Sequence, residues 1–143
     1  MLDKIYDKLN ELKTEKVINR ILMTVENSEA LKVSTQISNL PALFVYPIGL
    51  SAGTIQDRPN RTEQQVINTI GVLIALPTNQ LTTKKTKLGL GDLTIKIKEK
   101  LFGWQPDGAF DSVSYSGGSF ISSENKILFF ETQWTVTQLW QST

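Results

Sequence analysis

Residues 127–140, with the sequence ILFFETQWTVTQLW, give the clearest indication of the fold. Two sets of side chains alternate along this stretch, the first mainly apolar and the second mainly polar: Leu128, Phe130, Trp134, Val136 and Trp140 against Phe129, Glu131, Gln133, Thr135 and Thr137. Because successive side chains of a strand point to opposite faces, the alternation predicts one long β-strand. Ser122–Asn125 predicts a turn just before it, and residues 110–121 predict a partner strand interrupted by Gly117 and Gly118.

Two more strands are predicted upstream of this hairpin. Residues 42–50 contain the run Leu43–Tyr46, which is rich in residues that favour strands, and Pro41 disfavours a helix just before it. In residues 66–76, one set of apolar side chains shares a face, and Leu73–Leu76 predicts burial on both faces. Residues 51–60, rich in turn-forming residue types, are expected to form a loop between the two strands.

Helices are predicted over residues 2–12, 17–25 and 81–102, and the sequence leaves open whether the first two are separate helices or one bent helix. Apolar residues recur at helical spacing in each segment, and Gly103 stands where a helix-ending glycine is expected. The resulting element order is α-α-β-β-α-β-β. We therefore expect a single α+β domain over residues 1–143, with a mostly antiparallel four-stranded sheet and helices packed on one face.

The composition excludes several kinds of functional site. The 143 residues include no cysteine and no histidine. Disulfides, Cys/His zinc sites, and Ser-His-Asp or Cys-His catalysis are therefore impossible. The N-terminal segment alternates charge too often for a signal peptide, and no apolar run approaches the roughly 18 residues of a membrane span. We expect a soluble protein, made in the cytoplasm, without membrane partners.

No pattern predicts catalysis or a cofactor. Asp107 with Asp111, or Glu124 with Glu131, would supply a pair of carboxylates, but each carboxylate is explained as a solvated side chain at a turn or on a polar strand face. Gly89-Leu90-Gly91 lacks both the third glycine of a dinucleotide fingerprint and the ending of a P-loop. We therefore expect no enzyme activity, no cofactor and no metal.

Charge is unevenly distributed along the chain, although the net charge is only +1. Residues 84–100 hold six lysines and two acidic residues, whereas residues 101–143 hold one lysine and four acidic residues. A solvated helix face explains the later lysines. A small polyanion-binding module that uses the lysine cluster at 84–100 is an alternative, but no aromatic residue lies among these lysines to stack on bases.

Several short motifs occur in one order along the chain. Leu40–Tyr46 is an apolar segment that begins Leu-Pro-Ala, and residues 101–106 end a predicted helix with Gly103, Trp104, Gln105 and Pro106. Val113–Gly118 and the aromatic segment Ile127–Thr132 follow. In this order and spacing, residues 40–135 resemble the tail terminator proteins of long-tailed bacteriophages. Gly103, Trp104 and Pro106 are the structural motif of the resemblance.

The resemblance implies a structural role in the virion. Such proteins assemble as a ring, usually a hexamer, on the finished tail tube, stop its polymerisation and meet the head-completion or connector proteins at the tail-neck junction. The implied partners are further copies of the chain, the tube protein and the head-completion protein, while DNA only passes through the ring as cargo. Another neck, connector or baseplate component of a phage particle is the alternative.

Two segments are candidates for the contacts with other subunits or with the tube. The first lies at 51–63 and carries Asp57, Arg58, Arg61 and Glu63. The second lies at 78–87 and carries Lys84, Lys85 and Lys87. A cationic region and an anionic region in one chain suit head-to-tail contacts that close into a ring. Ordinary solvated loops explain the same residues without any partner.

Overall fold

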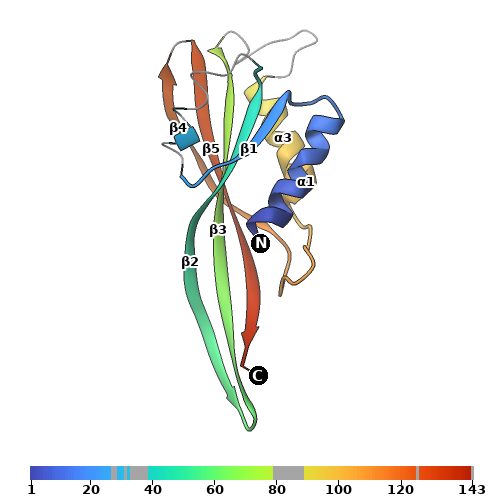
Figure 1. Cartoon of the computed structure of the whole chain (residues 1–143), viewed down its shortest axis with the longest axis vertical. Coiled ribbons are helices and arrows are strands. Elements are labelled where there is room, and N and C mark those ends of the chain that lie inside the picture. Colours follow the sequence, from blue (N-terminus) through green and yellow to red (C-terminus); the bar gives the residue numbers. More distant parts are fainter. Residues whose placement is uncertain (27–28, 31, 33–38, 79–88, 125, 143) are drawn as a thin grey trace.

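The computed structural model describes residues 1–26, 29–30, 32, 39–78, 89–124 and 126–142 (Figure 1). Its elements are α1 (Leu2–Thr14), β1 (Arg20–Met23), β2 (Ala42–Arg58), β3 (Arg61–Pro77), α3 (Leu90–Leu101), β4 (Ser114–Glu124) and β5 (Ile127–Gln141). The predicted α+β class is confirmed. The long strand predicted at the end of the sequence is confirmed as β5, and the helix predicted at 2–12 is confirmed as α1.

The sheet differs from the expected one. It has five strands in the order β1-β2-β3-β5-β4, and β1 runs parallel to β2 while the other neighbours are antiparallel. The prediction of four strands was wrong because residues 17–25, expected as a helix, contain β1. The expected element order, with two helices before the first strand, was wrong for the same reason.

The end of α1 explains this error. Lys16 adopts the left-handed conformation with φ 63°. The amide of Lys16 donates to the carbonyl of Lys13 at 3.0 Å, and the amide of Val17 donates to the carbonyl of Leu12 at 2.9 Å. These two bonds form a Schellman motif, which satisfies the last carbonyls and turns the chain out of the helix. A glycine at that position would have indicated the end of the helix, whereas a lysine does not.

Helices α1 and α3 cover one face of the sheet (Figure 1). Side chains of both helices form one core cluster with the residues of the strands that face them, among them Ile5, Leu9, Ile97, Val72 and Trp134. The opposite face carries a smaller cluster that includes Phe44, Tyr46, Leu73 and Phe129. Residues 72–76 therefore contribute to both clusters and are fully buried, as their unbroken apolar run predicts.

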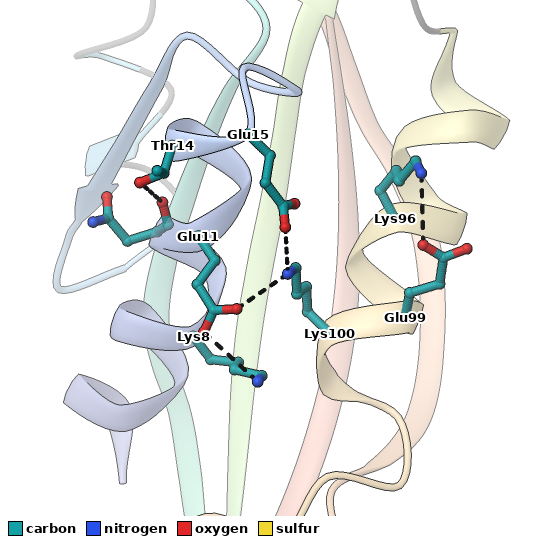
Figure 2. Close-up of polar contacts among 8 residues, drawn as sticks. Lys8, Glu11, Thr14, Glu15, Lys96, Glu99 and Lys100 are labelled. Carbon is teal, nitrogen blue, oxygen red and sulfur yellow. Dashed lines mark hydrogen bonds and ion pairs between the residues drawn. The ribbon is translucent and has the colours of Figure 1, made fainter.

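Lys100 joins the two helices at the surface. Its Nζ lies 3.1 Å from Oε1 of Glu11 and 2.7 Å from Oε1 of Glu15, both on α1 (Figure 2). Two further pairs, Lys8 with Glu11 and Lys96 with Glu99, each stay within one helix. The sequence predicts the last helix over 81–102. The described helix begins at Leu90, and residues 79–88 lie outside the described residues.

The segment expected as a loop at 51–60 is instead a continuation of the sheet. Strands β2 and β3 remain paired as far as Arg58 and Arg61, so that only Pro59 and Asn60 form the turn. Strand β5 accompanies β3 as far as Glu63, which pairs with Gln141. Residues 48–58 of β2 are exposed apart from the half-buried Gly53. With the paired parts of β3 and β5 they form an arm, whose hairpin end projects beyond the helices (Figure 1). The turn-forming residue types did not end β2, because its ladder with β3 continues to the hairpin turn and supplies backbone hydrogen bonds along the whole segment.

Candidate assembly interface

The first predicted contact set lies at the tip of the arm. Arg58 and Arg61 pair with each other across the hairpin and share the carboxylate of Glu63. The Nε of Arg58 lies 3.4 Å and the Nη2 of Arg61 2.8 Å from Oε1 of Glu63. Asp57 accepts a 3.0 Å hydrogen bond from the hydroxyl of Thr62. The structure therefore brings Arg58, Arg61 and Glu63 together, whereas Asp57 pairs with Thr62 and lies on the opposite face of the hairpin.

The two arginines stay accessible even though they are paired. The side chain of Glu63 is only 8% exposed, whereas those of Arg58 and Arg61 are about half exposed. The arginines thus neutralise a nearly buried carboxylate with part of their surface and present the rest to solvent. Such guanidinium groups donate to carboxylates in a planar, directional way. Whether the cluster touches another subunit stays a prediction.

The second predicted contact set, Lys84, Lys85 and Lys87, lies outside the described residues. The later lysines of the same charged stretch belong to α3. Lys96 pairs with Glu99, and Lys100 pairs with two glutamates of α1. Hydrogen bonds that Lys100 donates to Glu15 and Glu11 raise the pKa of Lys100. Lys100 therefore links the two helices and Lys96 is paired within α3, which weakens the interpretation of residues 84–100 as one polyanion-binding surface.

The Gly-Trp-Gln-Pro motif forms a tight turn after α3. Phe102 has φ −65° and ψ 122°, Gly103 has φ 80°, and the amide of Trp104 donates to the carbonyl of Leu101 at 3.1 Å. These values describe a type II turn, whose third position favours glycine. Trp104 packs against the core and under the ammonium of Lys8, while Pro106 is buried. The motif therefore ends the helix and anchors the following segment to the core.

A buried polar cluster lies on the face opposite the helices. The hydroxyl of Tyr46 donates to Oε2 of Glu131, and the amide of Gln133 donates to Oε1 of Glu131 at 2.7 Å. Burial raises the pKa of the Tyr46 hydroxyl, and Glu131 raises it further, so the tyrosine remains a donor. These residues line an open pocket of 340 Å³ together with Glu26, Pro47 and Ile48. The cluster satisfies the carboxylate of Glu131 within the chain.

Exposed apolar side chains on two strands were not predicted as contact residues. Leu50 and Ile55 lie on the arm part of β2, and Tyr115 and Phe120 lie on β4. Tyr115 stacks on Trp134 at 5.0 Å between ring centroids, and Phe120 meets Phe130 edge-on at 5.1 Å. In the sequence these residues only continue strand patterns. Their exposure depends on which strands end the sheet, and that follows from the topology.

Two kinds of site are absent from the part of the chain that the structure describes. It holds no group of three or more acidic residues arranged to bind a metal ion. None of its helices combines the length and the apolar character needed to cross a bilayer.

Comparison with known proteins identifies the family. A search of curated proteins gave no match. A family model described as phage tail terminator protein matches residues 11–141, which include all five strands and α3. This match confirms the resemblance that the sequence motifs indicate. The chain therefore belongs to the phage tail terminator protein family, and it is a structural component of the virion that associates with other components of the phage tail.

Proposed function

We propose that the chain forms a closed ring of six copies on the finished end of the tail tube. The ring ends tube polymerisation because its upper face, which points away from the tube, does not offer the contacts that the next ring of tube protein needs. The same surface receives the head-completion or connector protein at the tail-neck junction. DNA passes through the ring as cargo and is not a specific ligand.

The observation that carries this proposal is that the sheet is left open on both sides. Strand β4 ends the sheet along its whole length, and the arm part of β2 extends beyond β1, which pairs only with Ala42–Val45. Unpaired strand edges with apolar side chains beside them are unfavourable in an isolated subunit. Further copies of the chain would pair with both edges. Membership of the phage tail terminator protein family also supports assembly with other subunits.

Electron microscopy of phage particles made without this protein tests the proposal. Loss of the terminator removes the stop signal, so we expect tubes longer than those of the wild type that do not join to heads. Supplying the protein from a plasmid should restore the normal length. Complete absence of tails would instead indicate a baseplate component, and tails of normal length joined to heads would contradict the proposal.

A further inference from the structure

We infer that neighbouring copies in the ring join by antiparallel pairing of the arm part of β2 with β4 of the next copy, in one particular register. This inference rests on the proposed ring and deepens it, since it assigns the strands and side chains that meet. In that register Ile55 lies opposite Tyr115, and Leu50 lies opposite Phe120.

The directions of the two free edges allow this pairing. Strand β2 is antiparallel to β3, β3 is antiparallel to β5, and β5 is antiparallel to β4. Strands β2 and β4 of one copy consequently run in opposite directions. Rotation about a ring axis preserves these directions, so β4 of one copy and β2 of the next form an antiparallel pair. Because the two edges are different strands, the contact is head-to-tail, the type that closes into rings.

The apolar side chains of both edges lie on the same face of the sheet. Leu50 and Ile55 pair with Asn68 and Gln64 of β3, which in turn pair with Val136 and Trp140 of β5. Tyr115 and Phe120 pair with Trp134 and Phe130 of the same strand. All these β5 residues alternate in step with Trp134 and Val136, which face the helices. In a sheet continued from copy to copy, the four side chains would therefore meet on the helix side.

The spacing of the two pairs is the same. Positions on β2 and β4 can be compared through the β5 residues with which they align. Ile55 aligns with Trp140 and Tyr115 with Trp134, six residues apart. Leu50 aligns with Val136 and Phe120 with Phe130, also six residues apart. A single shift therefore brings both pairs into contact at once. Leu50 and Ile55 are five residues apart with a register irregularity between them, and so are Tyr115 and Phe120. Because each strand has one irregularity between its two apolar residues, both pairs of side chains stay aligned in the same register.

The size of the shift suits a closed sheet. Six residues of strand correspond to about 20 Å, and the step from β2 across β3, β5 and β4 to the next β2 covers about 19 Å at roughly 4.8 Å per strand. The strands would then tilt by about 45°, near the 35–45° that closed sheets typically show. The shift that matches the side chains is thus also compatible with ring closure.

The four side chains have the exposure that an interface needs. The exposed fractions are 62% for Leu50, 57% for Ile55, 43% for Tyr115 and 60% for Phe120. The stacking of Tyr115 on Trp134 and the edge contact of Phe120 with Phe130 hold both rings in place before association. Fixed aromatic anchors lose little conformational entropy on binding. The backbone amide of Phe110 donates a hydrogen bond to the carbonyl of Thr137. The same shift aligns Arg58 with this part of the next copy, so that the arginine would lie near the exposed Asp111.

Disulfide crosslinking of assembled particles tests this register. The chain has no cysteine of its own, so introduced cysteines are its only thiols. Phage are prepared with the double variants Leu50→Cys/Phe120→Cys and Ile55→Cys/Tyr115→Cys and are then oxidised. We expect a ladder of linked subunits on a non-reducing denaturing gel, because directly opposite residues of paired strands lie close enough for a disulfide.

Swapped pairs give the matched control. Leu50→Cys/Tyr115→Cys and Ile55→Cys/Phe120→Cys use the same four positions, but their partners lie four residues out of register, about 13 Å apart. We expect no ladder from them. Equal linking by the swapped pairs overturns the register, and linking by Leu50→Cys alone overturns the head-to-tail contact. Absence of a ladder from both matched pairs in particles with normal tails overturns the inference while the terminator function stands. Normal tails without the protein contradict the function itself.

Discussion

Gly71 shows how one residue fixes the packing of a strand. A Cβ at this position would lie 2.3 Å from Cε2 of Tyr46, its partner across the β2–β3 ladder. The glycine therefore leaves space for the ring, which is almost fully buried and reaches Glu131 through its hydroxyl. An aromatic ring that covers a cross-strand glycine in this way protects the backbone and fixes the pairing.

We expect Gly71→Ala to destabilise the chain by about 1–3 kcal/mol, since the buried Tyr46 ring must move to accommodate the methyl group. Urea unfolding followed by tryptophan fluorescence measures the change. Gly49→Ala is the matched control on β2, because a Cβ there meets nothing within 4 Å. Its stability should stay within about 0.5 kcal/mol of wild type. Equal stability of both variants would show that the ring adjusts without cost.

At the residue scale, the sequence indicated some positions and not others. Gly103 was predictable as a helix end, because its freedom to adopt positive φ is a property of the residue itself. The exposed aromatic residues Tyr115 and Phe120 were not, because the same side chains would be buried if another strand covered β4. Of the predicted tip residues, Asp57 lies on the other face of the hairpin, whereas Arg58, Arg61 and Glu63 come together, as their closeness in the sequence suggests. Their mutual ion pairs follow from the hairpin turn, which was missed.

Element ends decide how the N-terminal third folds. Helix α1 ends in a Schellman motif at Lys16, and the chain then enters β1 beside β2. The apolar residues at 17–25 satisfy a helical spacing and a short strand equally well. Contact with the edge of β2 selects the strand, and a pattern within 17–25 cannot show that contact.

We expect Lys16→Gly to stabilise the chain by about 0.5–1 kcal/mol, because glycine adopts φ 63° without the steric cost that a side chain carries. Thermal and urea unfolding measure the gain. Lys16→Ala retains a Cβ and should give no such gain. If alanine and glycine stabilise equally, loss of the lysine charge would be the cause, and the conformational explanation would be wrong.

The contact between α1 and α3 has a pH dependence of known sign. The hydrogen bond from Lys100 lowers the pKa of Glu11, and Glu15 and Glu11 raise that of Lys100. The stabilisation by Glu11 is therefore present above its ordinary pKa and is lost as the pH falls through the lowered value. The stabilisation by Lys100 is present below its ordinary pKa and is lost as the pH rises through the raised value.

We expect Lys100→Met to lower the Tm by roughly 1–3 °C at pH 7, because the pair is exposed and screened by solvent. The difference from wild type should shrink at an acidic pH below the lowered pKa of Glu11. Calorimetry at both pH values measures this change. Lys96→Met, whose pair with Glu99 stays within α3, should have a smaller effect. A difference that does not depend on pH would attribute the loss to packing of the lysine stem.

At the scale of the whole molecule, the chain consists of a body with two helices and an arm without them (Figure 1). The body buries the core, whereas the tip of the arm carries two basic and two acidic residues with no net charge: Arg58, Arg61, Asp57 and Glu63. In the proposed ring, this division would place folding in the body and subunit contacts in the arm. Changes at the tip should leave the core intact and affect contacts with other subunits.

We expect reversal of both arginines, Arg58→Glu with Arg61→Glu, to prevent capping and to give overlong tails. The variant changes the charge of the four tip residues from zero to −4 and leaves Glu63 without its cationic partners. Tail length by electron microscopy and particle yield measure the effect, and circular dichroism checks that the body stays folded. Lys96→Glu, a reversal away from the arm, is the control. Normal tail length and yield in the double variant would remove the tip from the interface.

The two unlike edges of the sheet also have a genetic consequence. A subunit altered on β4 alone keeps a sound arm, so it would still attach to one side of a growing arc and then block the next addition. Such a variant would be dominant-negative in a cell that also makes the normal protein, because one altered copy would prevent closure of the proposed six-copy ring. A variant altered on both edges would join nothing and would be recessive. Dominance in mixed infections would therefore distinguish a variant that has lost one of the two edges from a variant that has lost both.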